Sequence, residues 1–158
     1  MKIFRELHDL CVEQQIYIAT AESCTAGLLA SSIVSISGAS LFFKGAIIAY
    51  NNDIKINILG VSQSIIDKKT EVSSEVVEQM AEGVRGRFSV DFALATSGYA
   101  GPKGGTALNP VGTLFIALAS KERTISKRFV FSGDRQSVVN QGSIKAVELL
   151  VHELKKPY

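Results

Sequence analysis

The sequence has few of the side chains that build disulfide frameworks or zinc sites. Among its 158 residues are two cysteines, Cys11 and Cys24, and two histidines, His8 and His152. Two cysteines do not make a disulfide framework and fit a reducing compartment. No cluster of Cys and His exists, which argues against a structural zinc site. The two histidines lie near opposite ends of the chain, so a Ser-His-Asp triad is also disfavoured.

The sequence also has little net charge and no long apolar run. The chain carries 17 Lys and Arg against 15 Asp and Glu, a formal net charge of +2, so nothing favours bulk electrostatic binding to nucleic acid. No apolar run approaches the roughly 20 residues of a membrane span. The first ten residues carry charges throughout and contain no signal-peptide core. We therefore expect a cytoplasmic protein whose partners include neither nucleic acid nor membrane.

The remaining composition is that of an ordinary globular domain, 46% hydrophobic and 20% charged. Helical periodicity and caps predict helices at 2–14, 28–36, 54–60, 73–87 and 135–154. Apolar and β-branched runs predict strands at 16–21, 46–49, 90–96, 111–119 and 124–131, the last two as a hairpin. Residues 61–72 form a polar connection with one short helical turn. Helices that alternate with strands predict a single domain over residues 1–158, a three-layer α/β/α fold with a mixed β-sheet.

The stretch from 38 to 55 organises this prediction. The Ile-rich run 46–49 is typical of a strand buried on both faces. It is followed by Tyr50 and by the turn residues 51–53, which place Lys55 in the first turn of the next helix. Ser40 lies on the loop before the strand. A hydroxyl, a phenol and an amine so close in sequence suit a serine nucleophile with a lysine base. On these residues alone, a core strand flanked by ordinary surface residues is the commoner explanation.

Three loops, 22–27, 50–55 and 97–109, follow the ends of predicted strands. Ligands of open α/β sheets bind beyond the carboxyl ends of strands, so we expect these loops to converge on a site. The segment 97–106 has four glycines in ten residues and can aim backbone N–H groups at a phosphate or an oxyanion. It matches neither the P-loop nor the dinucleotide-binding glycine pattern. The alternative is a long loop that binds nothing.

Further candidates lie where helices are expected to begin. Arg135 would present a bidentate donor at a helix N-terminus, which suits a phosphate or carboxylate; a solvated surface arginine is the alternative. Ser23 or Thr25 is the expected N-cap of the helix at 28–36. Cys24 precedes that helix, in a position where a thiolate is stabilised, but no histidine is available as its base. A lysine with a pKa depressed by burial is the better candidate base for a hydrolase.

Taken together, the motifs resemble one family over residues 2–155, nearly the whole chain. They recur in order with matching spacing and comprise Ala21-Glu22-Ser23-Cys24-Thr25-Ala26-Gly27, Gly38-Ala39-Ser40, the segment 50–55, Leu59-Gly60-Val61, Val72-Ser73, the segment 97–102, Pro110-Val111-Gly112-Thr113 and Gly133-Asp134-Arg135. This pattern is similar to the CinA C-terminal domain family, which includes bacterial nicotinamide mononucleotide deamidases. The longer members of that family carry an additional N-terminal domain.

The resemblance implies an amidohydrolase that converts nicotinamide mononucleotide to nicotinic acid mononucleotide and ammonia. It implies a Ser/Lys mechanism without metal or cofactor, and a homo-oligomer of two or more copies. A non-catalytic nucleotide-binding module that acts through a partner protein is the alternative.

Site residues follow from the resemblance by position. It favours Ser40 as nucleophile, with Lys55 and Tyr50 as its catalytic partners and Ser23 as polar support or alternative nucleophile. Arg135 is the expected phosphate ligand. Backbone N–H groups of 98–105 or of 23–27 would receive the oxyanion. The other residues expected to contact the substrate are Ser97, Gly98, Ala100, Gly101, Thr25 and Gly27.

Three positions depart from the family pattern. Ala26 replaces a glycine, Ser37 stands where a proline is usual, and Ala46 replaces a second glycine. Position 26 matters most, because a Cβ there could narrow a pocket lined by backbone. The polar residues are unchanged, so the departures bear on efficiency or substrate rather than on the chemistry.

Overall fold

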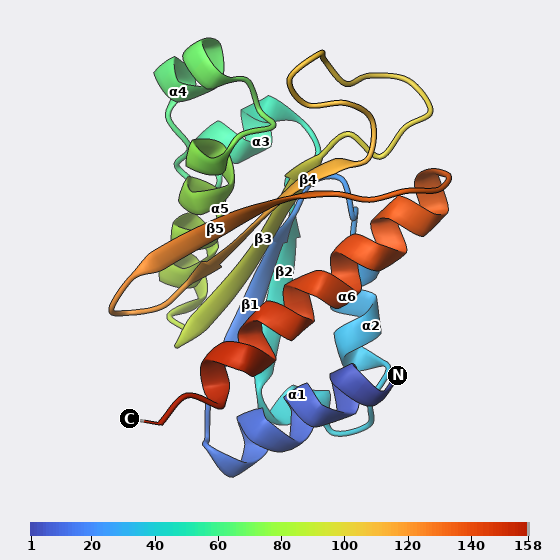
Figure 1. The fold of residues 1–158 in the computed structure, drawn as a ribbon. Coiled ribbons are helices and arrows are strands. Elements are labelled where there is room, and N and C mark those ends of the chain that lie inside the picture. The colour runs from blue at the N-terminus through green and yellow to red at the C-terminus, as the bar shows by residue number, and fades with distance from the viewer. Residues whose placement is uncertain (158) are drawn as a thin grey trace.

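The computed structural model describes residues 1–157 as a five-stranded sheet between two layers of helices (Figure 1). The strand order is β2-β1-β3-β4-β5, with β1 (Ile18–Glu22), β2 (Phe43–Ile48), β3 (Phe92–Gly98), β4 (Thr113–Ala119) and β5 (Thr124–Val130). The strands β2, β1 and β3 are parallel, whereas β4 and β5 are antiparallel to their neighbours. The predicted α/β/α fold with a mixed sheet is confirmed.

Each face of the sheet is covered by its own set of helices. One face packs against α1 (Lys2–Glu13), α2 (Leu28–Val34) and the long α6 (Arg135–Leu154), which crosses the sheet diagonally in Figure 1. The other face packs against α5 (Ser74–Phe88), beside which lie α3 (Asn52–Asn57) and α4 (Gln63–Lys69). The 3-10 turn η1 (Ala39–Leu41) precedes β2.

The two faces differ in side-chain size because strand residues alternate between them. Toward α1 and α6 the central strands present large residues, Ile18, Leu94, Ile116 and Leu118. Toward α5 they present six fully buried alanines, Ala19, Ala21, Ala93, Ala95, Ala117 and Ala119. We call these six residues the alanine face. Their short side chains let α5 pack close to the sheet.

The strand β2 differs from its prediction. The run 46–49 was expected to be buried on both faces, but β2 is an edge strand that pairs with β1 alone. Lys44 and Ile48 are exposed along it. The strand also begins earlier, at Phe43. An apolar run looks alike in a central strand and at an edge, so the sequence did not distinguish them.

Two local predictions are also wrong. The helix α2 is capped neither by Ser23 nor by Thr25: its N-cap residue is Gly27, and the carboxylate of Glu22 accepts hydrogen bonds from the N–H groups of Gly27, Leu29 and Ala30. The connection 61–72 contains the seven-residue helix α4 in place of a single turn.

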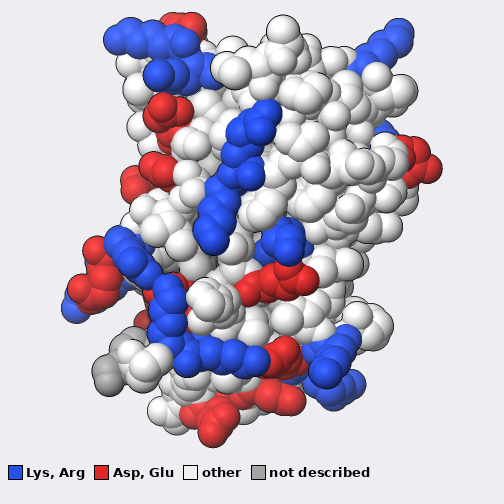
Figure 2. All heavy atoms as spheres, in the orientation of Figure 1, with Lys and Arg blue, Asp and Glu red and all other residues white. Residues whose placement is uncertain are grey.

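Neither a charged patch on the face seen in Figure 2 nor a membrane-spanning helix is a feature of the described residues. On the face seen in Figure 2, basic and acidic side chains lie interspersed and do not gather into one basic patch. None of the helices in residues 1–157 has both the length and the apolar character needed to cross a membrane.

Candidate active site

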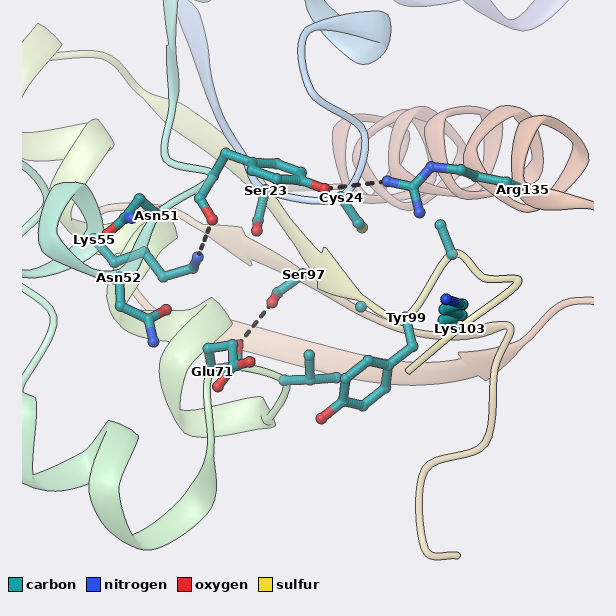
Figure 3. A pocket seen from close by; sticks show the side chains of 14 residues that line it. Ser23, Cys24, Asn51, Asn52, Lys55, Glu71, Ser97, Tyr99, Lys103 and Arg135 are labelled. Atoms are coloured by element: carbon teal, nitrogen blue, oxygen red, sulfur yellow. Dashed lines mark hydrogen bonds between the residues drawn. The ribbon is translucent and has the colours of Figure 1, made fainter. Parts of the chain in front are cut away.

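A cavity of about 440 Å³ opens beyond the carboxyl ends of β1, β2 and β3. Because the three strands are parallel, the loops that follow them meet at one edge of the sheet. The first residue of α6 and the segment before α5 complete the wall. The lining residues are Ser23, Cys24, Tyr50, Asn51, Asn52, Lys55, Glu71, Val72, Ser97, Gly98, Tyr99, Ala100, Lys103 and Arg135 (Figure 3).

Lys55 is the buried cation of this cavity, with 1% of its surface exposed. It lies on α3, whose first turn is fixed because the Asn51 side chain accepts a hydrogen bond from the N–H of Asp53. Its Nζ donates to the backbone carbonyl of Tyr50 at 3.4 Å. Burial lowers the pKa of Lys55, and the nearby Glu71 and Cys24 partly oppose that shift. A lysine whose charged form is disfavoured in this way is suited to act as a base.

Ser23 is the first residue after β1 and is 8% exposed. Its backbone N–H donates to the carbonyl of Thr96 at 3.0 Å, which ties the end of β1 to β3. Its hydroxyl makes no hydrogen bond to any other residue in the described range 1–157. Figure 3 shows this hydroxyl pointing into the cavity, where the side chains of Lys55 and Ser97 also end. Ser23 is therefore the cavity serine whose hydroxyl is free to react.

Ser97 is engaged in a structural contact. It is buried, and its Oγ donates to the backbone carbonyl of Glu71 at 2.7 Å. This hydrogen bond joins the end of β3 to the segment that leads into α5. It leaves Ser97 as a wall residue that fixes Glu71 against the cavity.

Arg135 lies on the side of the cavity away from Lys55 (Figure 3). The Arg135 guanidinium donates through Nη1 to the carbonyl of Gly101 at 2.7 Å and through Nη2 to the Tyr50 phenol at 3.2 Å. The phenol of Tyr50, an expected catalytic partner, thus contacts Arg135, whereas the Lys55 amine contacts the backbone carbonyl of Tyr50. Lys103 lines the cavity on the same side as Arg135 (Figure 3), so this side carries two cations suited to an anionic group.

Ser40 is not part of this cavity. It lies exposed on η1, at the amino end of β2, whereas Tyr50 and Lys55 follow the carboxyl end of that strand. Six strand residues intervene, a separation of about 20 Å at the usual rise per residue. The expected pairing of Ser40 with Lys55 is therefore wrong within one copy of the chain. Two residues that are close in sequence but flank a whole strand lie at opposite edges of the sheet.

The other expected contact residues divide between two cavities. Gly98 and Ala100 line the cavity of Lys55. Thr25, Gly27 and Gly101 line an adjoining hollow, to which Ala100 and Arg135 also contribute. Thr25 is buried, and its hydroxyl donates to the Glu22 carboxylate at 2.7 Å, so it supports the turn after β1.

Cys24 is a buried thiol, not a thiolate. Burial raises its pKa to about 12, which overturns the expectation that the following helix would stabilise its anion. A thiol in this state is a poor nucleophile at neutral pH. Within residues 1–157, no three His, Cys, Asp or Glu side chains come together as possible metal ligands.

None of the three departures from the family pattern lines the cavity of Lys55. Ala26 is exposed and adopts a left-handed backbone conformation, φ 45°, at the rim of the adjoining hollow. That conformation costs a residue with a Cβ roughly 1–2 kcal/mol, which explains the preference for glycine there. Ser37 is exposed before η1, and Ala46 lies within β2.

Sequence reasoning missed Glu71, Asn52 and Lys103 as cavity residues. Glu71 belongs to a polar connection without secondary-structure signal, and only its position beside the Val72-Ser73 motif could have drawn attention to it. Lys103 was passed over as one residue of a glycine-rich loop. Asn52 was interpreted only as a turn residue.

Comparisons with known proteins agree with this architecture. The CinA C-terminal domain matches residues 1–154. A "CinA-like protein" of Flavobacterium psychrophilum is 43% identical over 152 residues, which cover 96% of this chain and 36% of that protein. A second, from Fervidobacterium nodosum, is 42% identical over 150 residues, 92% of this chain and 37% of that protein. The chain thus spans little more than a third of the length of these curated relatives.

Solved structures superpose along almost the whole chain. The competence-damaged protein (CinA) superfamily protein from Enterobacter cloacae has a TM-score of 0.92 at 31% identity, covering 97% of this chain and 90% of its own. The competence damage-inducible protein A from Klebsiella pneumoniae has a TM-score of 0.94 at 30% identity, with 97% and 95% covered. Because the family domain matches residues 1–154 and a relative is 43% identical over 96% of the chain, the chain belongs to the CinA C-terminal domain family.

Proposed function

We propose that the chain hydrolyses the carboxamide of nicotinamide mononucleotide, giving nicotinic acid mononucleotide and ammonia. The observation that carries the proposal is the free hydroxyl of Ser23 in one cavity with the buried amine of Lys55. The choice of substrate is supported by the resemblance of the sequence to a family that includes nicotinamide mononucleotide deamidases. The cavity volume, about 440 Å³, lies in the range of small-molecule sites.

In this mechanism Lys55 acts as the base and Ser23 as the nucleophile. The neutral amine takes the proton of the Ser23 hydroxyl as Oγ attacks the carboxamide carbon. The resulting ammonium then protonates the amide nitrogen, which leaves as ammonia when the C–N bond breaks. Water, deprotonated by the same amine, attacks the ester on Ser23; the bond between the acyl carbon and Oγ breaks, the Lys55 ammonium returns its proton to Oγ, and the acid is released.

The phosphate of the substrate would lie at the opposite side of the cavity. Arg135 and Lys103 supply two positive charges there, and a guanidinium can hold two phosphate oxygens at once. To do so, Arg135 would give up its hydrogen bond to Tyr50. The reacting carboxamide would then lie near Ser23 and Lys55, and the phosphate at the distant side.

Two serine variants form the test. The purified chain is incubated with the mononucleotide, and ammonia and the acid product are measured. We expect Ser23→Ala to lower kcat by at least about a thousandfold, as loss of a nucleophile does. Ser40→Ala is the matched control and should stay within about twofold of the parent. Full activity of Ser23→Ala, or no turnover by the parent chain, would contradict the proposal.

The non-catalytic alternative would gain support if the departures at positions 26, 37 and 46 altered the cavity of Lys55. Because none of these residues lines the cavity of Lys55, their positions give that alternative no specific support.

A further inference from the structure

Glu71 is a carboxylate in the cavity to which the proposed mechanism gives no role. It lies in the segment between α4 and α5, is partly buried and lines the cavity. Its backbone carbonyl accepts the hydrogen bond from Ser97. Its neighbours are fixed by a turn in which the Ser73 hydroxyl donates to the carbonyl of Thr70 at 3.1 Å. The segment is thus held firmly against the end of β3.

The backbone of Glu71 is held in place, whereas its side chain has no partner in the described part of the chain that neutralises it. Among residues 1–157, its carboxylate makes no hydrogen bond and lies within 4.0 Å of no cationic group. It is still close enough to Lys55 to act on that amine electrostatically, as the largest influence opposing the effect of burial. Glu71 therefore adds a negative charge to the wall of the cavity that also contains Ser23, Lys55 and Ser97.

We propose that Glu71 is a specificity-determining residue that admits a neutral carboxamide and disfavours the carboxylate formed from it. This inference rests on the proposed function. A carboxylate is a hydrogen-bond acceptor only, so it can bind the NH₂ group of an amide. The acid product has no such donor and carries a charge of the same sign. In a partly desolvated cavity, two like charges repel each other more strongly than in water.

The same contact would orient the substrate. With its NH₂ group directed toward Glu71, the carboxamide turns its carbonyl oxygen away from that negative charge. The nitrogen that must leave is then on the side of the cavity where Lys55 can protonate it. After hydrolysis the contact becomes repulsive, so Glu71 favours release of the product.

Equilibrium binding measures this discrimination directly. Calorimetry with Ser23→Ala, in which the substrate is not consumed, gives the Kd of nicotinamide mononucleotide and of nicotinic acid mononucleotide. We expect the acid to bind more weakly than the amide. Adding Glu71→Gln, which keeps the shape and removes the charge, should reduce the ratio of the two Kd values by about tenfold or more. Glu71→Asp, which keeps the charge, should retain most of the ratio of Kd values measured with Glu71 in place.

Glu75→Gln is the matched control. Glu75 belongs to α5, forms an exposed ion pair with Lys69 at 3.7 Å and does not line the cavity. Its replacement should leave the ratio unchanged. An unchanged ratio in Glu71→Gln, with both nucleotides still bound, would overturn the role of Glu71 and leave the proposed function intact. Failure of Ser23→Ala to bind either nucleotide would overturn the proposed function itself.

Discussion

The guanidinium of Arg135 and the phenol of Tyr50, 85 residues apart, meet at 3.2 Å across the cavity. Tyr50 follows β2 and Arg135 begins α6, so the bond joins helices and strands from both halves of the chain. Tyr50 is 61% exposed, and its phenol is therefore easily displaced. An incoming phosphate would compete with it for the same donors.

Removal of Arg135 should weaken substrate binding more than it slows the chemistry. A hydrogen bond to a charged group is worth about 1.5–3 kcal/mol, so Arg135→Ala should raise KM by roughly 10- to 100-fold. The value of kcat should change by no more than a few-fold, because the guanidinium lies away from the reacting atoms. Steady-state kinetics with Arg5→Ala, an exposed arginine of α1, provides the control. A large fall in kcat at unchanged KM would contradict phosphate anchoring by Arg135.

The activity should rise with pH as Lys55 loses its proton. Burial lowers the pKa of Lys55 from its ordinary 10.5, while the negative charge of Glu71 opposes that shift in part. The neutral amine is the base, so kcat/KM should increase with pH through an apparent pKa below 10.5. It should be highest at pH values above that apparent pKa. Lys55→Arg should be as inactive as Lys55→Ala, because a guanidinium stays protonated. Full activity of Lys55→Arg would exclude lysine as the base.

Glu22 should contribute strongly to stability. Its carboxylate is fully buried and accepts five hydrogen bonds, three from backbone N–H groups at the start of α2 and two from the hydroxyls of Thr20 and Thr25. Glu22→Ala leaves these donors unsatisfied and should lower the free energy of unfolding by about 3 kcal/mol or more. Urea denaturation measures the change. Glu13→Ala, at an exposed glutamate of α1, should alter stability by less than about 0.5 kcal/mol.

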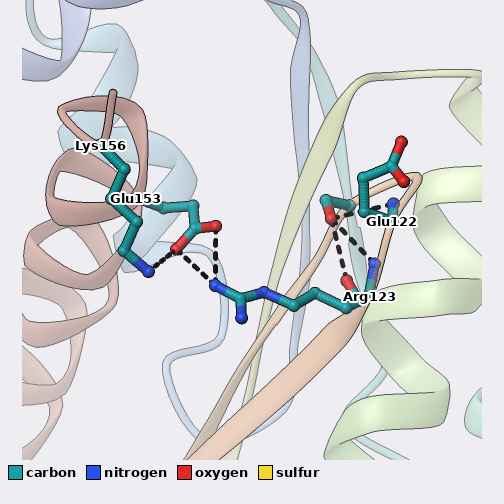
Figure 4. A network of polar contacts seen from close by, with 5 residues as sticks. Glu122, Arg123, Glu153 and Lys156 are labelled. Carbon is teal, nitrogen blue, oxygen red and sulfur yellow. Dashed lines mark hydrogen bonds and ion pairs between the residues drawn. The ribbon is translucent and has the colours of Figure 1, made fainter. Parts of the chain in front are cut away.

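The ion-pair network at the other end of the sheet should add a small, pH-dependent stabilisation (Figure 4). Arg123, in the turn between β4 and β5, and Lys156, after α6, both bind the carboxylate of Glu153. These contacts, led by the hydrogen bond from Lys156, hold the pKa of Glu153 below its ordinary 4.5. Arg123→Ala should cost at most about 1 kcal/mol at neutral pH, because the arginine is largely exposed.

The sign of the pH effect follows from the lowered pKa. The unfolded chain binds a proton at Glu153 more readily than the folded chain, so the network stabilises fully above pH 4.5 and loses its effect as pH falls through the folded-state pKa. Denaturation of Arg123→Ala and of the parent at neutral and acidic pH tests this. A difference between them that persists in acid would contradict the assignment to Glu153.

The order of helices and strands could be predicted from sequence because each long element carries its own periodicity and cap. Residues 135–154 show a helical repeat after Asp134, whose side chain accepts a hydrogen bond from the N–H of Ser137. The strands at 111–119 and 124–131 are rich in apolar and β-branched residues and are separated by a short turn. Such signals are local, and tertiary structure did not override them.

The site was only partly predictable, because its residues come together through the sheet. The resemblance brought Lys55, Ser23 and Arg135 to attention, and the structure places all three at one cavity. Ser40 has an equally strong motif and lies at the opposite edge of the sheet. Glu71 has no motif of its own and lies in the cavity. Neither position could be predicted from the sequence without knowing which end of each strand faces the site.

The alanine face also affects the width of the cavity of Lys55. The six alanines set the distance between the sheet and α5, and the segment leading into α5 carries Glu71 and Val72. A valine in place of Ala95 would force the helix outward, and the start of the helix would carry Glu71 away from Ser97. The small residues thus set the width of the cavity of Lys55. The geometry that the proposed reaction requires depends on methyl groups that do not line this cavity.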